Sequence, residues 1–179
     1  MKNHSSAALF LDRDGIVNID TGYVHTKEAF HFNPGIFQLC QLFAKHHYRI
    51  FVVTNQSGIH RGYYTTESFH QLTQWIHRMF RKQGINIEQT YFCPHLPNEG
   101  CTCRKPAPGM VHQAQKEYNI DLKASWMIGD KQSDIDLATQ AGIGHTIAIA
   151  AHPLEGAQYQ FETIEKCVDF LKKHEDKLA

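Results

Sequence analysis

Two aspartates with one residue between them, Asp12 and Asp14 in the stretch LFLDRDG, directly follow a short apolar run near the start of the chain. Carboxylates at this spacing can do different chemistry because the chain is turning. One can attack as a nucleophile, while the other gives a proton to a leaving group and later activates water. Gly15 permits the tight turn that would bring both within reach. The motif by itself is also compatible with a solvated turn after a strand.

A second acidic motif, GDKQSD, follows another apolar run and contains Asp130 and Asp134. Asp130 could join Asp12 around a hard divalent cation, which prefers oxygen ligands and keeps several waters. Asp134 lies near an expected helix start, where it could support the metal ligands or simply stabilise the helix N-terminus. The sequence leaves these two roles for Asp134 open.

Three of the five cysteines lie close together in the stretch CPHLPNEGCTCRKP, with a histidine among them. The spacing C-x-H-x5-C-x-C offers the ligand types of a closed, tetrahedral zinc site that leaves no position for water. We therefore expect a structural zinc site in a loop over about 93–103; a chance cluster of buried thiols and a redox pair are the alternatives. The zinc ligands would be Cys93, His95, Cys101 and Cys103. The other cysteines, Cys40 and Cys167, fit core positions without chemistry.

Short apolar runs alternate along the chain with amphipathic stretches, which predicts an α/β domain with a mainly parallel sheet. The 179 residues suit a single domain over 1–179. The pattern predicts strands over 7–11, 49–54, 88–92, 125–128 and 146–149. It predicts helices over 35–46, 66–81, 109–118, 133–141 and 162–172.

Polar residues that could do chemistry follow three of these strands. Asp12 comes after the first, Thr54 ends the second and Asp130 follows the fourth. In an open α/β sheet, ligands bind at the carboxyl ends of the strands. We therefore expect these side chains to form one site at that edge.

The composition indicates a soluble, neutral protein. Eighteen basic and eighteen acidic residues give a formal net charge of zero, whereas nucleic-acid and membrane-surface partners normally require a basic excess. The apolar run at 8–11 is too short for a signal-peptide core, and no run approaches the length of a membrane span. We expect a cytoplasmic monomer that binds a small molecule, not nucleic acid or a membrane.

The motifs LFLDRDG, VVTNQSG, RKPAPGM and MIGDKQSD together resemble the four ordered motifs of the haloacid dehalogenase (HAD) superfamily of phosphohydrolases. They extend over residues from about 9 to 136. The resemblance implies a HAD-like (Rossmannoid) three-layer fold with a mainly parallel sheet. It also implies Mg²⁺-dependent phosphoryl transfer through an aspartyl-phosphate.

The superfamily roles fall on matching positions of this chain. The resemblance makes Asp12 the nucleophile and a Mg²⁺ ligand, and Asp130 a second metal ligand. Asp14 would be the general acid and base, with its backbone carbonyl on the metal. Thr54 would hydrogen-bond the transferring phosphoryl group, and Lys105 would neutralise its oxygens. Phosphoryl transfer depends on such positioning and charge neutralisation.

The cysteine loop resembles the zinc loop of a HAD subfamily that contains the D,D-heptose 1,7-bisphosphate phosphatases and the histidinol-phosphate phosphatases. There the loop stands where other HAD enzymes place a cap domain, and an RKP segment follows it. The resemblance implies that this chain has no large cap domain and that zinc fixes Arg104 and Lys105. The five residues at 96–100 make the loop shorter than in many relatives, which would change its reach but not its ligands.

The stretch 19–24 resembles the heptose-phosphatase segment that touches the sugar. Asp20 could accept hydrogen bonds from sugar hydroxyls and Tyr23 could cover a ring face, with a solvated loop as the alternative. Arg104 could grip a second phosphate with two parallel hydrogen bonds. Lys131 could contact the transferring phosphate or could be solvated.

The polar residues after Thr54 also resemble the subfamily's substrate loop. Their amides could bind phosphate or hydroxyl groups, or Asn55 and Gln56 could merely hold the turn. The expected substrate-binding residues are therefore Asp20, Thr21, Gly22, Tyr23, Asn55, Gln56, Ser57, Arg104 and Lys131.

The expected function is hydrolysis of the 7-phosphate of D-glycero-D-manno-heptose 1,7-bisphosphate, in the carbohydrate metabolism that supplies heptose for lipopolysaccharide. Histidinol-phosphate phosphatase is the first alternative, but the sequence locates no extra acidic residues for that substrate's ammonium group. Polynucleotide end-processing is a second alternative, because TNQ motifs also occur there, and zero net charge counts against it. A non-enzymatic zinc-containing binding module is a third, which would have no reason to keep all the catalytic residues.

Overall fold

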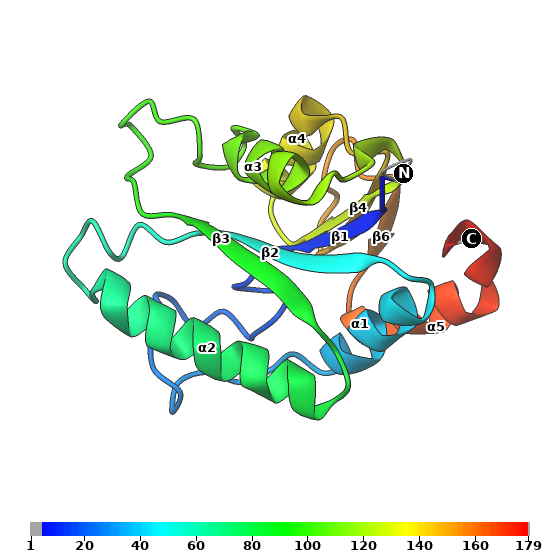
Figure 1. Ribbon diagram of the computed structural model, residues 1–179, viewed down its shortest axis with the longest axis horizontal. Helices are drawn as coiled ribbons and strands as arrows, with labels where there is room; N and C mark the ends of the chain where they lie inside the picture. Colours follow the sequence, from blue (N-terminus) through cyan, green and yellow to red (C-terminus); the bar gives the residue numbers. More distant parts are fainter. Residues whose placement is uncertain (1–4, 179) are drawn as a thin grey trace.

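The first strand, β1 (Ala8–Leu11), is apolar throughout and completely buried. Such a run is typical of a central strand in a parallel sheet that is covered on both faces. The computed structural model, which describes residues 5–178, places β1 in the middle of a six-stranded sheet of order β3-β2-β1-β4-β5-β6 (Figure 1). All pairings are parallel. The other strands are β2 (Arg49–Asn55), β3 (Ile87–Cys93), β4 (Trp126–Gly129), β5 (His145–Ile149) and β6 (Tyr159–Phe161).

Helices cover both faces of the sheet, which makes three layers (Figure 1). Successive side chains of a strand point to opposite faces, so Leu9 and Leu11 enter one core cluster while Ala8 and Phe10 enter the other. The first cluster includes residues of α1 (Ile36–Lys45), α2 (Thr66–Lys82) and α5 (Ile164–Lys173). The second includes residues of α3 (Gly109–Tyr118) and α4 (Gln132–Ala141). Two short 3₁₀ helices, η1 (Leu122–Ala124) and η2 (Glu175–Leu178), complete the elements.

The predicted three-layer fold with a parallel sheet is confirmed, and each predicted strand and helix is present within two residues of its expected bounds. Strand β6 and both 3₁₀ helices were not expected. Strand β6 has three residues, none of them fully buried, and lies at the sheet edge beside β5. A strand this short carries no readable alternation of apolar and polar residues.

Two long connections lead away from the carboxyl edge of the sheet. Residues 12–35 join β1 to α1, and residues 94–108 form the long loop between β3 and α3 at the upper left of Figure 1. Neither connection contains a helix or any of the six strands of the sheet. These two connections therefore hold no large cap domain, as expected.

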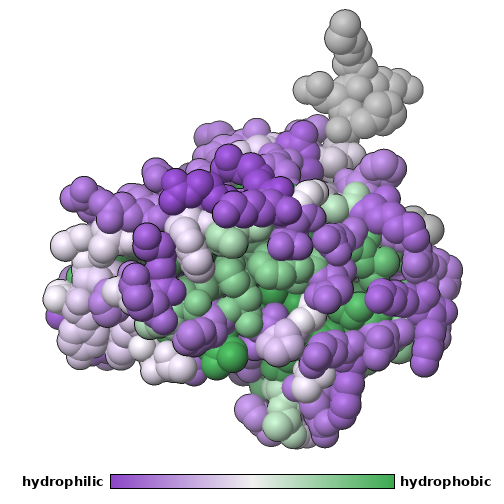
Figure 2. Space-filling view, turned by 90° about the horizontal axis from the view of Figure 1, so that it is seen from below, coloured by the Kyte–Doolittle hydropathy of each residue, from purple (hydrophilic) through white to green (hydrophobic). Residues whose placement is uncertain are grey.

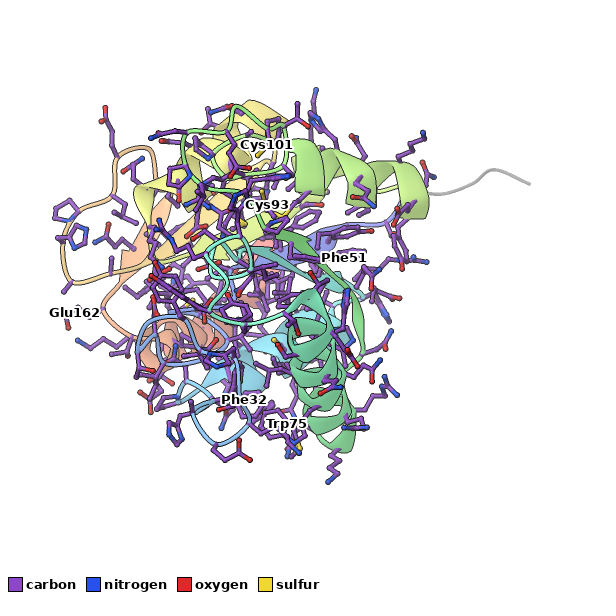
Figure 3. The ribbon with its side chains drawn as sticks, turned by 90° about the vertical axis from the view of Figure 1, so that its left-hand side faces the viewer. Phe32, Phe51, Trp75, Cys93, Cys101 and Glu162 are labelled. Carbon is purple, nitrogen blue, oxygen red and sulfur yellow. The ribbon has the colours of Figure 1, made fainter. Side chains whose placement is uncertain are left out.

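The face below the sheet carries half-buried aromatic side chains. Phe32 and Trp75, at the lower edge of Figure 3, stack with ring centroids 5.7 Å apart and pack on the core. Figure 2, which looks at the molecule from below, shows apolar side chains gathered in the middle of this face with hydrophilic ones around them. Across the residues described, no helix combines the length and apolar character that a membrane span requires.

Candidate active site and metal centres

The carboxyl ends of β1, β2 and β4 bring the predicted catalytic residues together. Asp12 follows β1, and its backbone N–H still donates to the carbonyl of Ile128 in β4. Thr54 lies in β2, and Asp130 follows β4 directly. Both Asp12 and Thr54 are buried. The predicted convergence of these side chains on one edge is therefore present.

Lys105 is buried at the centre of this edge, although it lies far along the chain from β1. Its Nζ donates to Asp12 Oδ1 at 2.5 Å and to the carbonyl of Val53 at 3.0 Å. It also pairs with Asp134 Oδ1 at 2.7 Å. Burial alone would lower the pKa of Lys105, but the two carboxylates together raise it above its usual value. The ammonium therefore stays charged and faces the carboxylate that is expected to be the nucleophile.

Asp12, Asp130 and Asp134 form an acidic cluster with one carboxylate oxygen of each within 4.8 Å of the others. Asp130 Oδ1 is buried without a hydrogen-bond partner in the described part of the chain. A buried polar atom left unpaired in this way fits a metal ligand. Carboxylate oxygens are the donors that Mg²⁺ prefers, so the residues present fit the magnesium site implied by the resemblance.

Asp134 caps the helix that follows it and pairs with Lys105, while its support of a metal ligand stays a prediction. Its Oδ2 accepts from the backbone N–H groups of Asp130 and Lys131, at 3.2 and 3.1 Å, and so caps the start of α4. Its Oδ1 pairs with Lys105 at 2.7 Å. Both oxygens of Asp134 are therefore engaged, one by the backbone at the start of α4 and the other by the Lys105 ammonium.

Gly15 lets the two strand ends come close together. Its φ of +100° is in the left-handed region, and a Cβ at this position would lie 2.2 Å from Asp130 Oδ2. Any larger residue would displace the Asp130 carboxylate. Glycine therefore suits both the turn and the observed position of the Asp130 carboxylate.

The carboxylates of Asp12 and Asp130 are buried close to each other, and the pKa of each is raised. Burial raises the pKa of Asp12, while Lys105 acts in the opposite direction. Burial, with the neighbouring charge of Asp12, raises the pKa of Asp130 to about 7. A divalent cation would relieve this repulsion, since it favours the ionised carboxylates.

Asp14 lies beside the cluster and is held by side chains on two sides. Its Oδ1 accepts from Arg13 Nη2 at 2.8 Å, from Arg13 Nε at 3.2 Å and from Asn18 Nδ2 at 3.1 Å. Its Oδ2 accepts from Gln56 Nε2 at 2.9 Å. Arg13 is itself buried and also donates to the carbonyl of Val24. The sequence analysis assigned no role to Arg13 or Asn18, because nothing local shows which carboxylate they reach.

The two amides after Thr54 hold neighbouring parts of the site. Asn55 Oδ1 accepts from the backbone N–H of Lys105 at 3.0 Å, and Asn55 Nδ2 donates to the carbonyl of Lys105 at 3.3 Å. Gln56 is buried and donates to Thr54 Oγ1 at 2.8 Å as well as to Asp14. In this structure both amides hold the site together, and substrate contact by either residue stays a prediction.

A cavity of about 220 Å³ opens over the carboxylates. It exposes most of the predicted catalytic and substrate-binding residues to a common space. Two further lining residues, Tyr64 and Ser133, were not among the expected site residues: Tyr64 belongs to no recognised motif, and Ser133 lies in the motif GDKQSD but was assigned no role there. The lining consists of Asp12, Asp14, Asp20, Gly22, Tyr23, Asn55, Gln56, Ser57, Tyr64, Lys105, Lys131 and Ser133.

The segment expected to touch the sugar forms part of this wall. Asp20 accepts from the backbone N–H of Gly22 and from Lys131 Nζ, at 2.9 and 3.3 Å. Tyr23 is 47% exposed and lines the cavity, and its ring packs edge-on against that of Tyr63 with centroids 4.8 Å apart. Thr21 is exposed but lines neither this cavity nor the one beside it.

The cysteine loop brings its four predicted ligands together. Figure 3 shows Cys93 and Cys101 near one another above the sheet. Their Sγ atoms are 3.6 Å apart, and those of Cys101 and Cys103 are 3.7 Å apart. Sulfurs around tetrahedral zinc, with bonds of about 2.3 Å, stand about 3.8 Å apart. His95 Nδ1 lies 3.4 Å from Cys93 Sγ and 3.3 Å from Cys103 Sγ.

All five cysteines are free. The Sγ atoms of Cys93 and Cys103 lie 2.7 Å apart, which is longer than the roughly 2.05 Å of a disulfide bond. Three thiols and one imidazole within 4.8 Å of one another fit a structural zinc site. Cys40 and Cys167 are buried in the core, as expected.

The cysteine loop is followed by the two basic residues, Arg104 and Lys105, that it was expected to position. Arg104 Nη1 donates to the carbonyl of His95 at 3.0 Å, which ties the side chain to the loop. Arg104 lines a second cavity, of about 500 Å³, that shares Asn55, Ser57, Lys105, Lys131 and Ser133 with the first. A substrate with two phosphates could therefore reach Lys105 and Arg104 together.

Taken with the parallel sheet, the buried lysine between aspartates and the acidic cluster define a HAD-type phosphotransfer site. A family model described as HAD-hydrolase-like matches residues 102–151. In a solved structure, the D,D-heptose 1,7-bisphosphate phosphatase of B. bronchiseptica is complexed with magnesium and phosphate. It superposes with a TM-score of 0.82 at 28% identity, covering 94% of this chain and 99% of that chain.

Curated proteins are more similar still. The D-glycero-beta-D-manno-heptose-1,7-bisphosphate 7-phosphatase of Helicobacter pylori (strain ATCC 700392 / 26695) is 44% identical over 172 residues, 94% of this chain and 99% of its own. The D-glycero-alpha-D-manno-heptose-1,7-bisphosphate 7-phosphatase of Campylobacter jejuni is 45% identical over 167 residues, 93% of this chain and 96% of its own. The chain belongs to the heptose-1,7-bisphosphate 7-phosphatase family of the HAD superfamily. The expected resemblance is confirmed.

Proposed function

We propose that this protein is a Mg²⁺-dependent phosphatase that removes the 7-phosphate of D-glycero-D-manno-heptose 1,7-bisphosphate. The observation that carries the chemistry is the buried contact of Lys105 with Asp12, beside Asp130 and its unpaired oxygen. The substrate class rests on the names of the relatives that match nearly the whole chain.

The first step uses Asp12 as the nucleophile. An Asp12 oxygen attacks phosphorus, and the bond from phosphorus to the sugar oxygen breaks. Asp14 gives its proton to that leaving oxygen, so the sugar departs as an alcohol. The product of this step is an aspartyl-phosphate on Asp12.

The second step releases phosphate. Asp14, now ionised, takes a proton from a water molecule, whose oxygen attacks the phosphorus of the aspartyl-phosphate. The bond from phosphorus to the Asp12 oxygen breaks, which restores the free carboxylate. Asp14 regains the proton needed for the next turnover.

Charge neutralisation comes from one side chain and one cation. Lys105 lies within hydrogen-bond distance of Asp12 and would neutralise the phosphoryl oxygens, while the Thr54 hydroxyl would donate to them. Mg²⁺, held by Asp12, Asp130 and the Asp14 carbonyl, would offset the repulsion between an anionic nucleophile and a dianionic substrate.

The proposal also assigns roles to the zinc site and to the residues that line the cavities. Zinc on Cys93, His95, Cys101 and Cys103 would fix the loop and thereby Arg104, which would bind the second phosphate. Asp20, Tyr23 and Lys131 would contact the substrate at the first cavity. Thr21, Gly22, Asn55, Gln56 and Ser57 would complete the substrate loops.

We also propose that residues 1–179 act as one domain and as a cytoplasmic monomer, without nucleic acid or membrane partners. Zero net charge supports the absence of a nucleic-acid partner. Size-exclusion chromatography with light scattering tests the monomer: a mass near 20.5 kDa is expected, and twice that value would contradict it.

Phosphate release with Mg²⁺ tests the function. The substrates are both anomers of heptose 1,7-bisphosphate and histidinol phosphate, because similar relatives are named for either anomer. Preference for one heptose anomer, lost in Asp12→Asn, is expected. Preference for histidinol phosphate would overturn the substrate but keep the catalytic residues. No turnover that depends on Asp12 would sink the phosphatase proposal.

A further inference from the structure

Gln56 occupies a buried position where all of its polar atoms are used. Its Oε1 accepts from the hydroxyl of Tyr64 at 2.5 Å. Its Nε2 donates to Asp14 Oδ2 at 2.9 Å and to Thr54 Oγ1 at 2.8 Å. One amide therefore joins the expected acid–base residue to the expected phosphoryl-binding hydroxyl, and Tyr64 lies at its far end.

The phenol of Tyr64 decides which way this amide faces. Tyr64 is buried, and burial raises its pKa to about 12. Its hydroxyl therefore remains a donor at ordinary pH and requires the oxygen of Gln56 opposite it. An amide turned the other way would set its oxygen against the carboxylate of Asp14, and two acceptors repel.

Tyr64 is itself held in place by its surroundings. The ring of His25 stacks on it with centroids 5.0 Å apart and planes 7° from parallel. On another side lies Gly58, where a Cβ would be 2.2 Å from Tyr64 Cε1. The ring thus has little freedom, and the hydroxyl has a defined direction toward Gln56.

The hydrogen bonds also locate the proton that Asp14 must carry as an acid. Oδ1 already accepts three N–H groups, from Arg13 and Asn18. Oδ2 accepts one, from Gln56. The proton therefore has room on Oδ2, on the side that Gln56 does not occupy. Loss of the Gln56 contact would let the carboxyl group turn about its Oδ1 anchor.

We infer that Tyr64 is a positioning residue for the phosphatase reaction: through Gln56 it fixes the orientation of the Asp14 carboxyl group. The inference rests on the proposed acid–base role of Asp14. It also gives Thr54 a defined direction, since the hydroxyl accepts from Gln56 and keeps its own hydrogen for the phosphoryl group.

The test is a double-mutant cycle on heptose 1,7-bisphosphate hydrolysis. Tyr64→Phe keeps the stacked ring and removes only the donor, and we expect kcat to fall about tenfold with KM within about twofold. Gln56→Met removes the whole bridge, and we expect a loss of about a hundredfold. Because Tyr64 acts through Gln56, the double variant should equal Gln56→Met within about twofold.

Tyr91→Phe is the matched control. Tyr91 is 5% exposed and Tyr64 is 8% exposed, and each donates a hydrogen bond of 2.5 Å, that of Tyr91 to Glu117. Its variant should lose similar stability in thermal unfolding, with kcat unchanged. Equal kcat losses in Tyr64→Phe and Tyr91→Phe, or additive losses in the cycle, would overturn the inference.

A second substrate distinguishes a loss of Asp14 positioning from a general disturbance of the active site in Tyr64→Phe. p-Nitrophenyl phosphate has a leaving group that departs without a proton. Its kcat/KM should fall less than that of the sugar bisphosphate in Tyr64→Phe, and likewise in Asp14→Asn. If kcat/KM fell equally for both substrates in Tyr64→Phe but unequally in Asp14→Asn, the inference about Tyr64 would be overturned while the proposed function would stand. A wild-type chain inactive on both would overturn the proposed function as well.

Discussion

Lys105 lies in the interior between the carboxylates of Asp12 and Asp134. Burying a charge is costly unless it is paired, and removal of one partner leaves the others uncompensated. Under the proposed function, folding and catalysis would therefore depend on the same ammonium group. Because of the acidic cluster around it, we expect a neutral residue in place of Lys105 to change both properties.

Lys105→Met should lower turnover by at least about a hundredfold, because the phosphoryl oxygens lose their positive partner. It should also lower the free energy of unfolding by about 3–5 kcal/mol, since the aspartates stay buried without a counter-charge. Phosphate-release kinetics and urea unfolding check this. Lys131→Met, whose side chain is 53% exposed, is the control for stability and should unfold like wild type. Unchanged stability in Lys105→Met would contradict the buried pairing.

Gly15→Ala should weaken Mg²⁺ binding at least about tenfold, because the new Cβ would displace a metal ligand. The reason is the predicted 2.2 Å approach of that Cβ to Asp130 Oδ2. Gly62→Ala is matched in backbone: its φ is +71° and nothing lies within 4 Å of the added Cβ. It should suffer similar backbone strain but keep its Mg²⁺ affinity. Equal Mg²⁺ affinity in both variants, measured by titration calorimetry, would contradict the role of Gly15.

Without metal, the raised pKa of Asp130, about 7, should make the protein less stable as pH rises from about 4 through 7. The folded state then binds more protons than the unfolded state, whose carboxyl has the ordinary pKa of 3.8. Mg²⁺ needs the ionised carboxylate, so its stabilising effect should be larger at pH 8 than at pH 6. Thermal unfolding with EDTA or Mg²⁺ at both pH values checks this. Asp130→Asn should remove the difference.

Among the elements of the fold, the cysteine loop is the one whose rigidity would depend on a metal ion. It begins at the end of β3 and ends just before Lys105, and the backbone of Lys105 is also clamped by Asn55. The loop contains no helix or strand of its own. Four ligands closing on one ion would therefore supply the rigidity that hydrogen-bonded structure supplies elsewhere.

Cys101→Ser should reduce bound zinc from one ion per chain to a small fraction, because the tetrahedral set loses a thiolate. We expect kcat to fall by about tenfold to a hundredfold as Arg104 and Lys105 lose their support. Metal analysis and steady-state kinetics provide the measurements. Cys167→Ala changes a buried cysteine outside the loop and should retain zinc. Full activity in a zinc-free Cys101→Ser protein would show that the loop does not need the ion.

At the scale of the whole molecule, two adjoining cavities share one wall, with Lys105 in common and Arg104 in the outer one. Within the described residues no cap domain covers them, and under the proposed function Arg104, which follows the cysteine loop, would bind the second phosphate. This arrangement suits a substrate with phosphates at both ends. Under the proposed function, Lys105 would serve the reacting phosphate and Arg104 the distant one.

Arg104→Gln should lower kcat/KM for heptose 1,7-bisphosphate by about tenfold to a hundredfold, because a bidentate contact with phosphate is lost. For heptose 7-phosphate, which lacks the second phosphate, the change should stay within about twofold. The ratio of the two kcat/KM values is the measurement. Equal losses for both substrates would place Arg104 at the transferring phosphate instead.

Much of the fold could be predicted because local patterns carry it. The apolar run of β1 and the face of α2 that carries Phe69, Leu72, Ile76 and Phe80 are properties of neighbouring residues. Strand β6 could not be predicted, since its three residues gain their structure from pairing with β5. The same limit applied to Arg13 and Asn18, whose contacts with Asp14 depend on how the chain turns after β1.

The sequence by itself determined the family, the order of the strands and helices along the chain, and which cysteine, histidine and aspartate side chains gather into two candidate metal sites, because motifs and periodicity are local. Only the tertiary structure decided that Asp134 faces Lys105, that Asn55 clamps the Lys105 backbone, and that Tyr64 reaches Asp14 through Gln56. The physical reason is that such contacts join segments distant in sequence. Their geometry is set by packing of the whole sheet and its loops, which no local pattern specifies.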